Sequence, residues 1–186
     1  MNDQEIIDLY WARCENAIQE TDRKYGKLCY RIAWNILGNV QDSEECVSDT
    51  YMKAWNAIPP SRPDKLSAFL GKITRNLALN RYERNSAARR GGGEVPVALD
   101  ELSECIPDPH TVEAMMDEKA LTQQLNTFLG GLSREARSIF LRRYWELASV
   151  REIAESYGIS ESKVKVSLFR TRGKLKAFLD KEGITL

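Results

Sequence analysis

The chain has 186 residues, with 27 Lys or Arg and 27 Asp or Glu, and this length suits one medium domain or two small ones. Its apolar runs are short and its start lacks the pattern of a signal peptide, so we expect no membrane insertion and a cytoplasmic location. The four cysteines form no Cys-x-x-Cys pair and His110 is the single histidine, so we expect no zinc site, no disulfide framework and no other cofactor.

The zero net charge hides a strong segregation along the chain. Residues 62–90 carry eight Lys or Arg against two Asp or Glu, and residues 119–186 carry thirteen against seven. The segment between them, residues 91–118, carries eight acids and no Lys or Arg. Two basic blocks favour two surfaces for a polyanion, although solvated helix faces would give a similar pattern.

Apolar residues recur at helical spacing and the alternation typical of strands is rare, so we expect an all-α fold. The first two apolar stripes fall on residues 6–17 and 28–37. A third helix is expected to begin at Asp42, with Glu45 in the capping-box position, and to end before Pro59.

A fourth helix is expected over residues 67–85, and its composition differs from that of the others. One side is apolar, with Phe69, Ile73 and Leu77, while the opposite side is rich in asparagine and arginine. The donors on this opposite side are Lys72, Arg75, Asn76, Asn80, Arg81 and Arg84.

The helical pattern breaks in a stretch that contains three consecutive glycines, three prolines and a cluster of acids. Such a composition is typical of a linker. We therefore expect two small helical domains, residues 1–85 and residues 115–186, joined by a flexible acidic linker at residues 86–114.

The second domain has the pattern of a helix-turn-helix between residues 150 and 179. A short helix with Ile153 and Ala154 on one face is stopped by Gly158, and Ser160 is placed to cap the helix that follows. That helix is apolar on one side and basic on another, which is typical of a helix that reads the major groove of DNA. A helical hairpin with a solvated basic face would look similar. The DNA contacts that we expect from this winged-helix-like domain are Ser160, Glu161, Ser162, Lys163, Lys165, Ser167, Arg170, Arg172 and Lys174.

Three stretches carry a resemblance to a known family: the acidic DSEECVSD at residues 42–49, FLGKITRNLALNRYER at residues 69–84, and EIAESYGISESKVKVSLFRTRGKL at residues 152–175. Their motifs, order and spacing resemble those of the extracytoplasmic-function (ECF) sigma factors, the compact group of bacterial RNA polymerase sigma factors. The resemblance implies a factor that directs transcription initiation and is not an enzyme.

The resemblance also implies roles for each domain. The helix at residues 42–58 would dock on the clamp helices in the largest subunit of core RNA polymerase. The helix at residues 67–85, with its six donors, would engage the minus-ten promoter element and capture an unstacked base, while the second domain would read the minus-thirty-five element as duplex. An anti-sigma factor is implied as a further partner. The implied polymerase contacts are Asp42, Glu45, Asp49, Met52 and Trp55.

Two other classes of protein share parts of this pattern. An autonomous activator or repressor, with an N-terminal sensing or dimerisation domain, would contain the helix-turn-helix but would not explain the basic helix at residues 67–85. An enzyme acting on nucleic acid would need a carboxylate cluster for a metal ion or a positioned nucleophile. The acids at residues 42–49 lie at a helix start without a histidine partner, which disfavours this third class.

Overall fold

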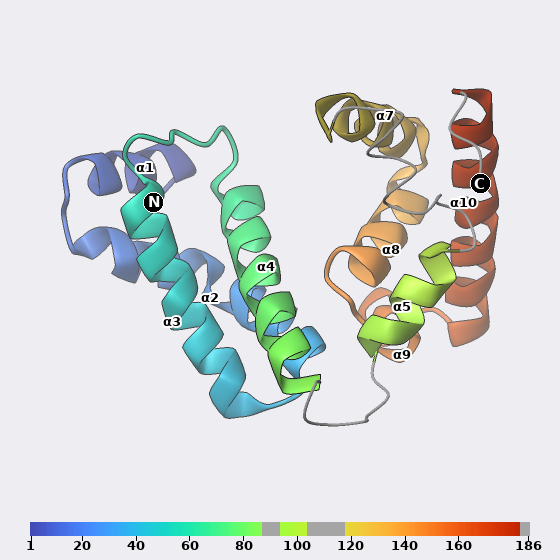
Figure 1. Cartoon of the computed structure of the whole chain (residues 1–186), viewed down its shortest axis with the longest axis horizontal. Coiled ribbons are helices and arrows are strands. Elements are labelled where there is room, and N and C mark those ends of the chain that lie inside the picture. The colour runs from blue at the N-terminus through green and yellow to red at the C-terminus, as the bar shows by residue number, and fades with distance from the viewer. Residues whose placement is uncertain (87–93, 104–117, 183–186) are drawn as a thin grey trace. The chain divides into compact units, whose positions relative to one another are not determined.

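A computed structural model describes residues 1–86, 94–103 and 118–182. All regular elements in these ranges are α-helices, which confirms the predicted all-α fold (Figure 1). The contacts divide the chain into unit 1, Met1–Gly91, and unit 2, Gly92–Leu186. Within the described ranges, no helix combines the length and the apolar character that crossing a membrane requires.

The described part of unit 1, residues 1–86, contains four helices, in which α2, α3 and α4 pack against one another and α1 packs on α2 (Figure 1). Their apolar faces meet in one core, made of Ile6, Ile7, Tyr10, Ala17, Cys29, Val47, Tyr51, Ala54, Ile58, Leu66 and Leu70. The helix bounds are α1 Asp3–Trp11, α2 Asn16–Leu37, α3 Val40–Ala57 and α4 Leu66–Ser86.

Polar contacts fix α3 against α4 and hold the start of α4. The buried hydroxyls of Thr50 on α3 and Thr74 on α4 lie 3.1 Å apart, and each lies 2.8 Å from a carbonyl oxygen of its own helix. Asp3 on α1 accepts a hydrogen bond from the Leu66 backbone N–H at 3.3 Å. Because buried polar groups need partners, these bonds define how α3 and α4 lie side by side.

The third helix begins two residues earlier than the sequence predicts. Its first residue is Val40, and the side chain of Asn39 caps it by accepting a hydrogen bond from the Asp42 backbone N–H at 2.9 Å. Asn39 thus provides the capping oxygen that the sequence pattern assigns to Asp42. Asp42 lies instead in the first turn, where a carboxylate is favoured by the helix dipole.

Unit 2 contains five described helices around its own core. The aromatic rings of Phe128, Phe140 and Phe178 pack together, with centroids 6.3 Å apart for Phe128–Phe140 and 5.7 Å apart for Phe128–Phe178. The helix bounds are α5 Glu94–Ser103, α7 Glu118–Gly131, α8 Arg134–Tyr144, α9 Val150–Tyr157 and α10 Glu161–Lys181.

Helices α9 and α10 form the predicted helix-turn-helix. Gly158 ends α9 with a φ of 61°, a conformation that favours glycine, and the Ile159 backbone N–H donates to the Ala154 carbonyl at 3.1 Å. The side chain of Ser160 then caps α10 by accepting from the Lys163 backbone N–H at 3.2 Å. A winged helix adds a β-hairpin, and the described residues of unit 2 contain no strand, so no wing lies among them.

Part of the predicted linker is helical. Helix α5 lies within residues 86–114 and packs on α8, with Ala98 fully buried. Pro96 did not prevent this helix, because it lies in the first turn, where its missing N–H breaks no helical hydrogen bond. The remainder of the linker after Ser86, with Cys105 and His110, lies outside the described residues.

Candidate nucleic-acid interface

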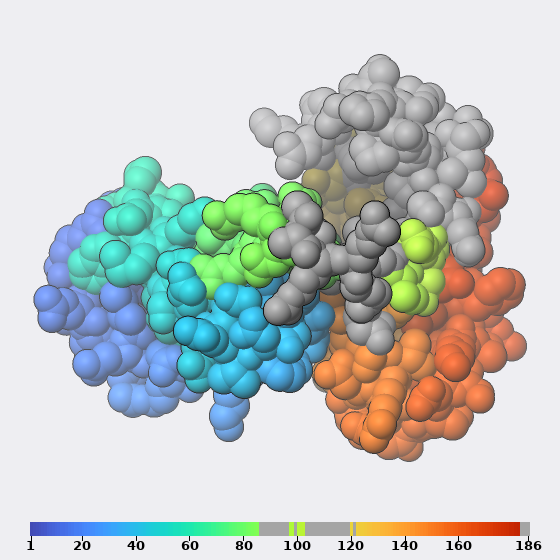
Figure 2. All heavy atoms as spheres, turned by 60° about the horizontal axis from the view of Figure 1, so that its bottom comes forward, coloured from blue at the N-terminus to red at the C-terminus, as the bar shows by residue number. Residues whose placement is uncertain are grey.

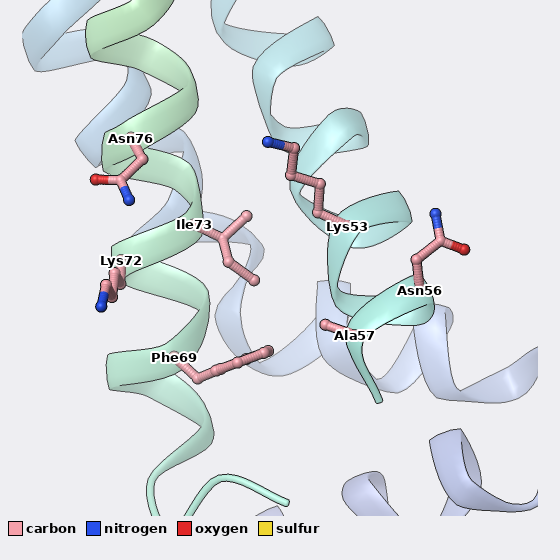
Figure 3. Close-up of a pocket in the computed structure, with 7 residues that line it drawn as sticks. All are labelled: Lys53, Asn56, Ala57, Phe69, Lys72, Ile73 and Asn76. Carbon is pink, nitrogen blue, oxygen red and sulfur yellow. The ribbon is translucent and has the colours of Figure 1, made fainter. Parts of the chain in front are cut away.

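A hollow of about 520 Å³ lies between α3 and α4 in unit 1. Figure 3 shows Phe69 and Ile73 projecting from α4 toward Ala57, and Lys53 extending from α3 toward α4. The hollow thus combines an apolar surface with amides and ammonium groups, as binding sites for small planar groups do. Its lining residues are Lys53, Asn56, Ala57, Phe69, Lys72, Ile73 and Asn76.

Four of the six predicted minus-ten residues lie along one side of α4. Lys72, Asn76, Asn80 and Arg84 follow one another at four-residue spacing, and all four are exposed. We call this row the α4 stripe; its first two members also line the hollow. The C-terminal part of α4, green in Figure 2, lies open at the surface of unit 1.

The other two predicted minus-ten residues do not belong to the α4 stripe. Arg75 is half-buried, and this burial lowers the pKa of its guanidinium. The side chain of Arg81 is only 16% exposed and turns toward α3. The structure therefore brings four of the six predicted DNA contacts together and separates two from them.

Arg81 binds three carboxylates of α3, Asp42, Glu45 and Asp49, which we call the acid trio. Its Nη2 atom lies 2.9 Å from Glu45 Oε1 and 3.5 Å from Asp49 Oδ2, and its Nη1 atom lies 3.6 Å from Asp42 Oδ1. The hydrogen bond from Arg81 lowers the pKa of Glu45. The sequence pattern assigns these residues to two separate surfaces, and the structure joins them.

The two predicted apolar polymerase contacts differ in exposure. Met52 is 55% exposed and continues the face of α3 that carries the acid trio, at three- and four-residue steps. Trp55 is half-buried, with its ring 6.0 Å from that of Tyr10 and the Arg13 guanidinium 5.3 Å from its centroid. Met52 is therefore open to a partner, whereas much of Trp55 is used inside unit 1.

In unit 2, most of the predicted DNA contacts lie on the open side of α10. A groove of about 250 Å³ separates this helix from the first turn of α8. Lys163 crosses it and forms an ion pair with Glu135 at 2.8 Å. The remaining groove residues are Ser133, Ala136, Val166, Ser167, Arg170, Thr171 and Lys174.

Two apolar residues on this side of α10 were missed by the sequence analysis. Val166 is exposed, and Phe169 has the largest exposed fraction, 71%, among the large hydrophobic residues that the structure describes. Both lie off the buried row that includes Val164 and Leu168, and their positions on the helix could have revealed this. Exposed apolar groups on a groove-reading helix can contact the methyl group of thymine.

Arg172 does not lie on the open side of α10. Its side chain is 17% exposed and donates to the hydroxyl of Tyr144 at 2.9 Å and to Glu101 at 3.5 Å. The predicted phosphate contact by Arg172 therefore has no support in this conformation, because its guanidinium is engaged between α5, α8 and α10.

Two family models match the chain: Sigma-70 region 2 over residues 22–88, and Sigma-70, region 4, over residues 122–175. The first covers most of unit 1, including α3 and α4, and the second covers the helix-turn-helix. A match to region 2 does not favour the alternative of an autonomous regulator with a sensing or dimerisation domain.

Curated relatives agree with these models. SigE of Mycolicibacterium smegmatis, an ECF RNA polymerase sigma factor, is 25% identical over 164 residues, which are 88% of this chain and 62% of SigE. SigL of Mycobacterium tuberculosis is 27% identical over 87% of this chain and 88% of its own length, and SigW of Bacillus subtilis is 25% identical over 92% and 86%. The chain thus spans less than two thirds of the length of SigE.

Among solved structures, CnrH in complex with the cytosolic domain of CnrY matches 96% of this chain and 97% of that chain, with 21% identity and a TM-score of 0.45. The family models and the curated relatives carry the assignment. Together with the helix-turn-helix of unit 2, they show that the chain belongs to the ECF type of RNA polymerase sigma factors.

Proposed function

We propose that this chain directs core RNA polymerase to promoters in the cytoplasm, using unit 1 for the minus-ten element and unit 2 for the minus-thirty-five element. It acts by binding and not by catalysis, and an anti-sigma factor controls its access to polymerase. The observation that carries the proposal is the hollow between α3 and α4, which continues into the exposed donors of the α4 stripe.

At the minus-ten element, the hollow receives one base that leaves the DNA stack. Unstacking costs a few kcal/mol. Stacking on an aromatic ring such as Phe69 returns about 1–3 kcal/mol, and the amide of Asn76, which lines the hollow, supplies hydrogen bonds to the base edge. Asn80 and Arg84, further along the α4 stripe, bind the adjacent backbone.

At the minus-thirty-five element, the first turns of α10 enter the major groove. Glu161, Ser162 and Lys165 are exposed there and reach base edges, while Val166 and Phe169 contact thymine methyl groups. The phosphates lie along the groove between α8 and α10 and bind its basic residues, Lys163, Arg170 and Lys174.

The polymerase contact lies on the face of α3 that carries the acid trio and Met52. Three carboxylates on one helix face suit the basic surface expected of the clamp helices, and the exposed Met52 adds an apolar contact. Trp55 is assigned a packing role within unit 1, because the ring already contacts Tyr10 and Arg13.

The proposal is tested by run-off transcription and by permanganate footprinting of the opened promoter with core polymerase. Asn76→Ala should bind the duplex promoter but open it less than the unchanged chain does. On DNA that carries an abasic site at the captured position, the two proteins should open the promoter equally, because neither has a base to capture. Asn126→Ala, the same change at an exposed position of α7 outside every proposed contact surface, is the matched control. Normal opening by Asn76→Ala, or no promoter-specific transcript with the unchanged chain, would overturn the proposal.

A further inference from the structure

Arg81 occupies a position between the two binding surfaces proposed for unit 1. It belongs to α4 and lies between Asn80 and Arg84 of the α4 stripe in sequence, but its guanidinium contacts the acid trio of α3. Asn85, one helical turn further on, adds a longer contact of 3.5 Å from its amide to Asp42 Oδ2. In the free chain, Arg81, which belongs to the helix proposed to bind DNA, therefore fills part of the surface proposed to bind polymerase.

The charges in this contact are unequal. Three carboxylates face one guanidinium, so the group keeps an excess of two negative charges. The carboxylates of Glu45 and Asp49 are about half exposed or more, whereas the Arg81 side chain is mostly buried between α3 and α4. A cationic partner can therefore approach the acid trio from outside without first moving a helix.

Besides these ion pairs, Arg81 Nη1 donates a hydrogen bond to the Asp42 backbone carbonyl at 3.3 Å, and all of these contacts can be exchanged. Pairs with solvent-exposed carboxylates are individually weak and are screened by salt, so a partner that presents several Lys or Arg side chains can replace a single guanidinium. Once released, Arg81 lies one helical turn before Arg84, and side chains three apart on a helix are neighbours. Its guanidinium can then add to the donors of the α4 stripe.

We propose that Arg81 is an internal occupant of the polymerase-binding surface: a basic helix of polymerase displaces it from the acid trio, and the released side chain binds the phosphate backbone of minus-ten DNA. This inference rests on the proposed function and adds a coupling between its two surfaces. Because coupling between binding sites is reciprocal, polymerase raises the affinity for single-stranded DNA by the same factor by which DNA raises the affinity for polymerase.

The test compares Arg81→Gln with Arg84→Gln in the full chain, using core polymerase and a single-stranded oligonucleotide of the minus-ten element as probes. Arg81→Gln removes the internal competitor, so it should bind core polymerase about three- to fivefold more tightly at low salt, and this gain should shrink as salt is added. Arg84→Gln, which leaves the acid trio occupied, should bind core polymerase as the unchanged chain does.

The oligonucleotide gives the second measurement. The unchanged chain should bind it several-fold more tightly in complex with core polymerase than alone, and Arg81→Gln should lose most of this difference. Arg84→Gln should weaken oligonucleotide binding in both states. Arg81→Lys keeps the charge and should restore much of the difference, which separates coupling from a general loss of structure.

The outcomes separate this inference from the proposed function. Equal or weaker polymerase binding by a folded Arg81→Gln variant would overturn the coupling alone, since Arg81 would then only shape the acid trio. If Glu45→Gln and Asp49→Asn also left polymerase affinity unchanged, or if the unchanged chain did not bind core polymerase, the proposed polymerase surface itself would be wrong.

Discussion

The carboxylate of Glu101 on α5 accepts two hydrogen bonds from the guanidinium of Arg143 on α8, of 2.9 Å and 3.2 Å. Arg143 is 1% exposed, and its Nη1 atom also donates to the Ala148 carbonyl at 3.0 Å. The Tyr144 hydroxyl donates to the same carboxylate at 2.9 Å. A buried guanidinium needs such a paired arrangement, so Glu101 ties a segment predicted as linker to the helix-turn-helix unit.

Glu101→Gln should therefore destabilise unit 2. It removes the negative charge that faces the buried guanidinium of Arg143, and losing a hydrogen-bonded charge partner of this kind costs about 2 kcal/mol. Thermal unfolding followed by circular dichroism should show a lower melting temperature. Glu155→Gln is the control, because it removes an exposed pair with Arg151 and should change the melting temperature little. Equal melting temperatures for the two variants would show that the Glu101–Arg143 pair contributes nothing net.

The same pair predicts a response to acid. Burial alone would raise the pKa of Glu101, but hydrogen bonds from Arg143 and Tyr144 bring it below the ordinary value of 4.5. A carboxyl whose pKa is lower in the folded state stabilises the fold above its unfolded pKa and loses that contribution as pH falls through the folded pKa. Unfolding measured from pH 6 downward should show unit 2 losing stability below about pH 4.5, and Glu101→Gln should lose less over that interval. Parallel curves for the two proteins would contradict this assignment.

Two glycines of unit 2 should respond to alanine with opposite signs. Gly158 has a φ of 61°, so Gly158→Ala should cost about 1 kcal/mol. Gly173 lies inside α10, where an added methyl group would meet open space, so Gly173→Ala should stabilise the chain by about 0.5–1 kcal/mol. Chemical denaturation of both variants checks the pair, and a stabilising Gly158→Ala would contradict the turn geometry.

Phe169 should contribute to promoter affinity without contributing to stability. Phe169→Ala removes a side chain that is 71% exposed, so the melting temperature should stay unchanged while polymerase holoenzyme binds the minus-thirty-five duplex about tenfold more weakly. Replacing thymine by uracil in that element should weaken the unchanged chain but not the variant. Equal sensitivity of both proteins to uracil would mean that Phe169 contacts no thymine methyl group.

Trp55 and Met52 should separate stability from polymerase binding. Trp55→Ala removes a ring packed on Tyr10 and should cost about 2 kcal/mol in the free energy of unfolding. Met52→Ala removes an exposed side chain, so it should leave the unfolding free energy unchanged and weaken binding to core polymerase. If Trp55→Ala were as stable as the unchanged chain but bound core polymerase weakly, Trp55 would be a polymerase contact and not a packing residue of unit 1.

Local signals in the sequence were sufficient for the helix-turn-helix. Gly158 and Ser160 act on the backbone within a few residues of their own positions, so their roles could be read without knowing the fold. Helix α5 could not be predicted in the same way. It is short and contains Pro96, and the contact between Glu101 and Arg143 joins residues that are far apart in the sequence.

In the candidate site, too, local spacing could be read from the sequence, whereas contacts between helices could not. Four-residue spacing was enough to place Lys72, Asn76, Asn80 and Arg84 on one side of a helix. Composition could not show that Arg81 turns toward α3 or that Arg172 turns toward Glu101, because both directions depend on helices that pack nearby. The hollow between α3 and α4 likewise required the packing of two helices.

The lysines at the start of α10 already have carboxylate partners, Lys163 with Glu135 at 2.8 Å and Lys165 with Glu161 at 3.9 Å. A phosphate that binds either lysine must displace the carboxylate or share the lysine with it, and in both cases the carboxylate stays close to the DNA. The helix then releases fewer condensed cations from the duplex than its Lys and Arg content suggests. Because the salt dependence of DNA affinity follows the number of cations released, promoter occupancy should decline less steeply with rising salt than a count of basic residues would predict.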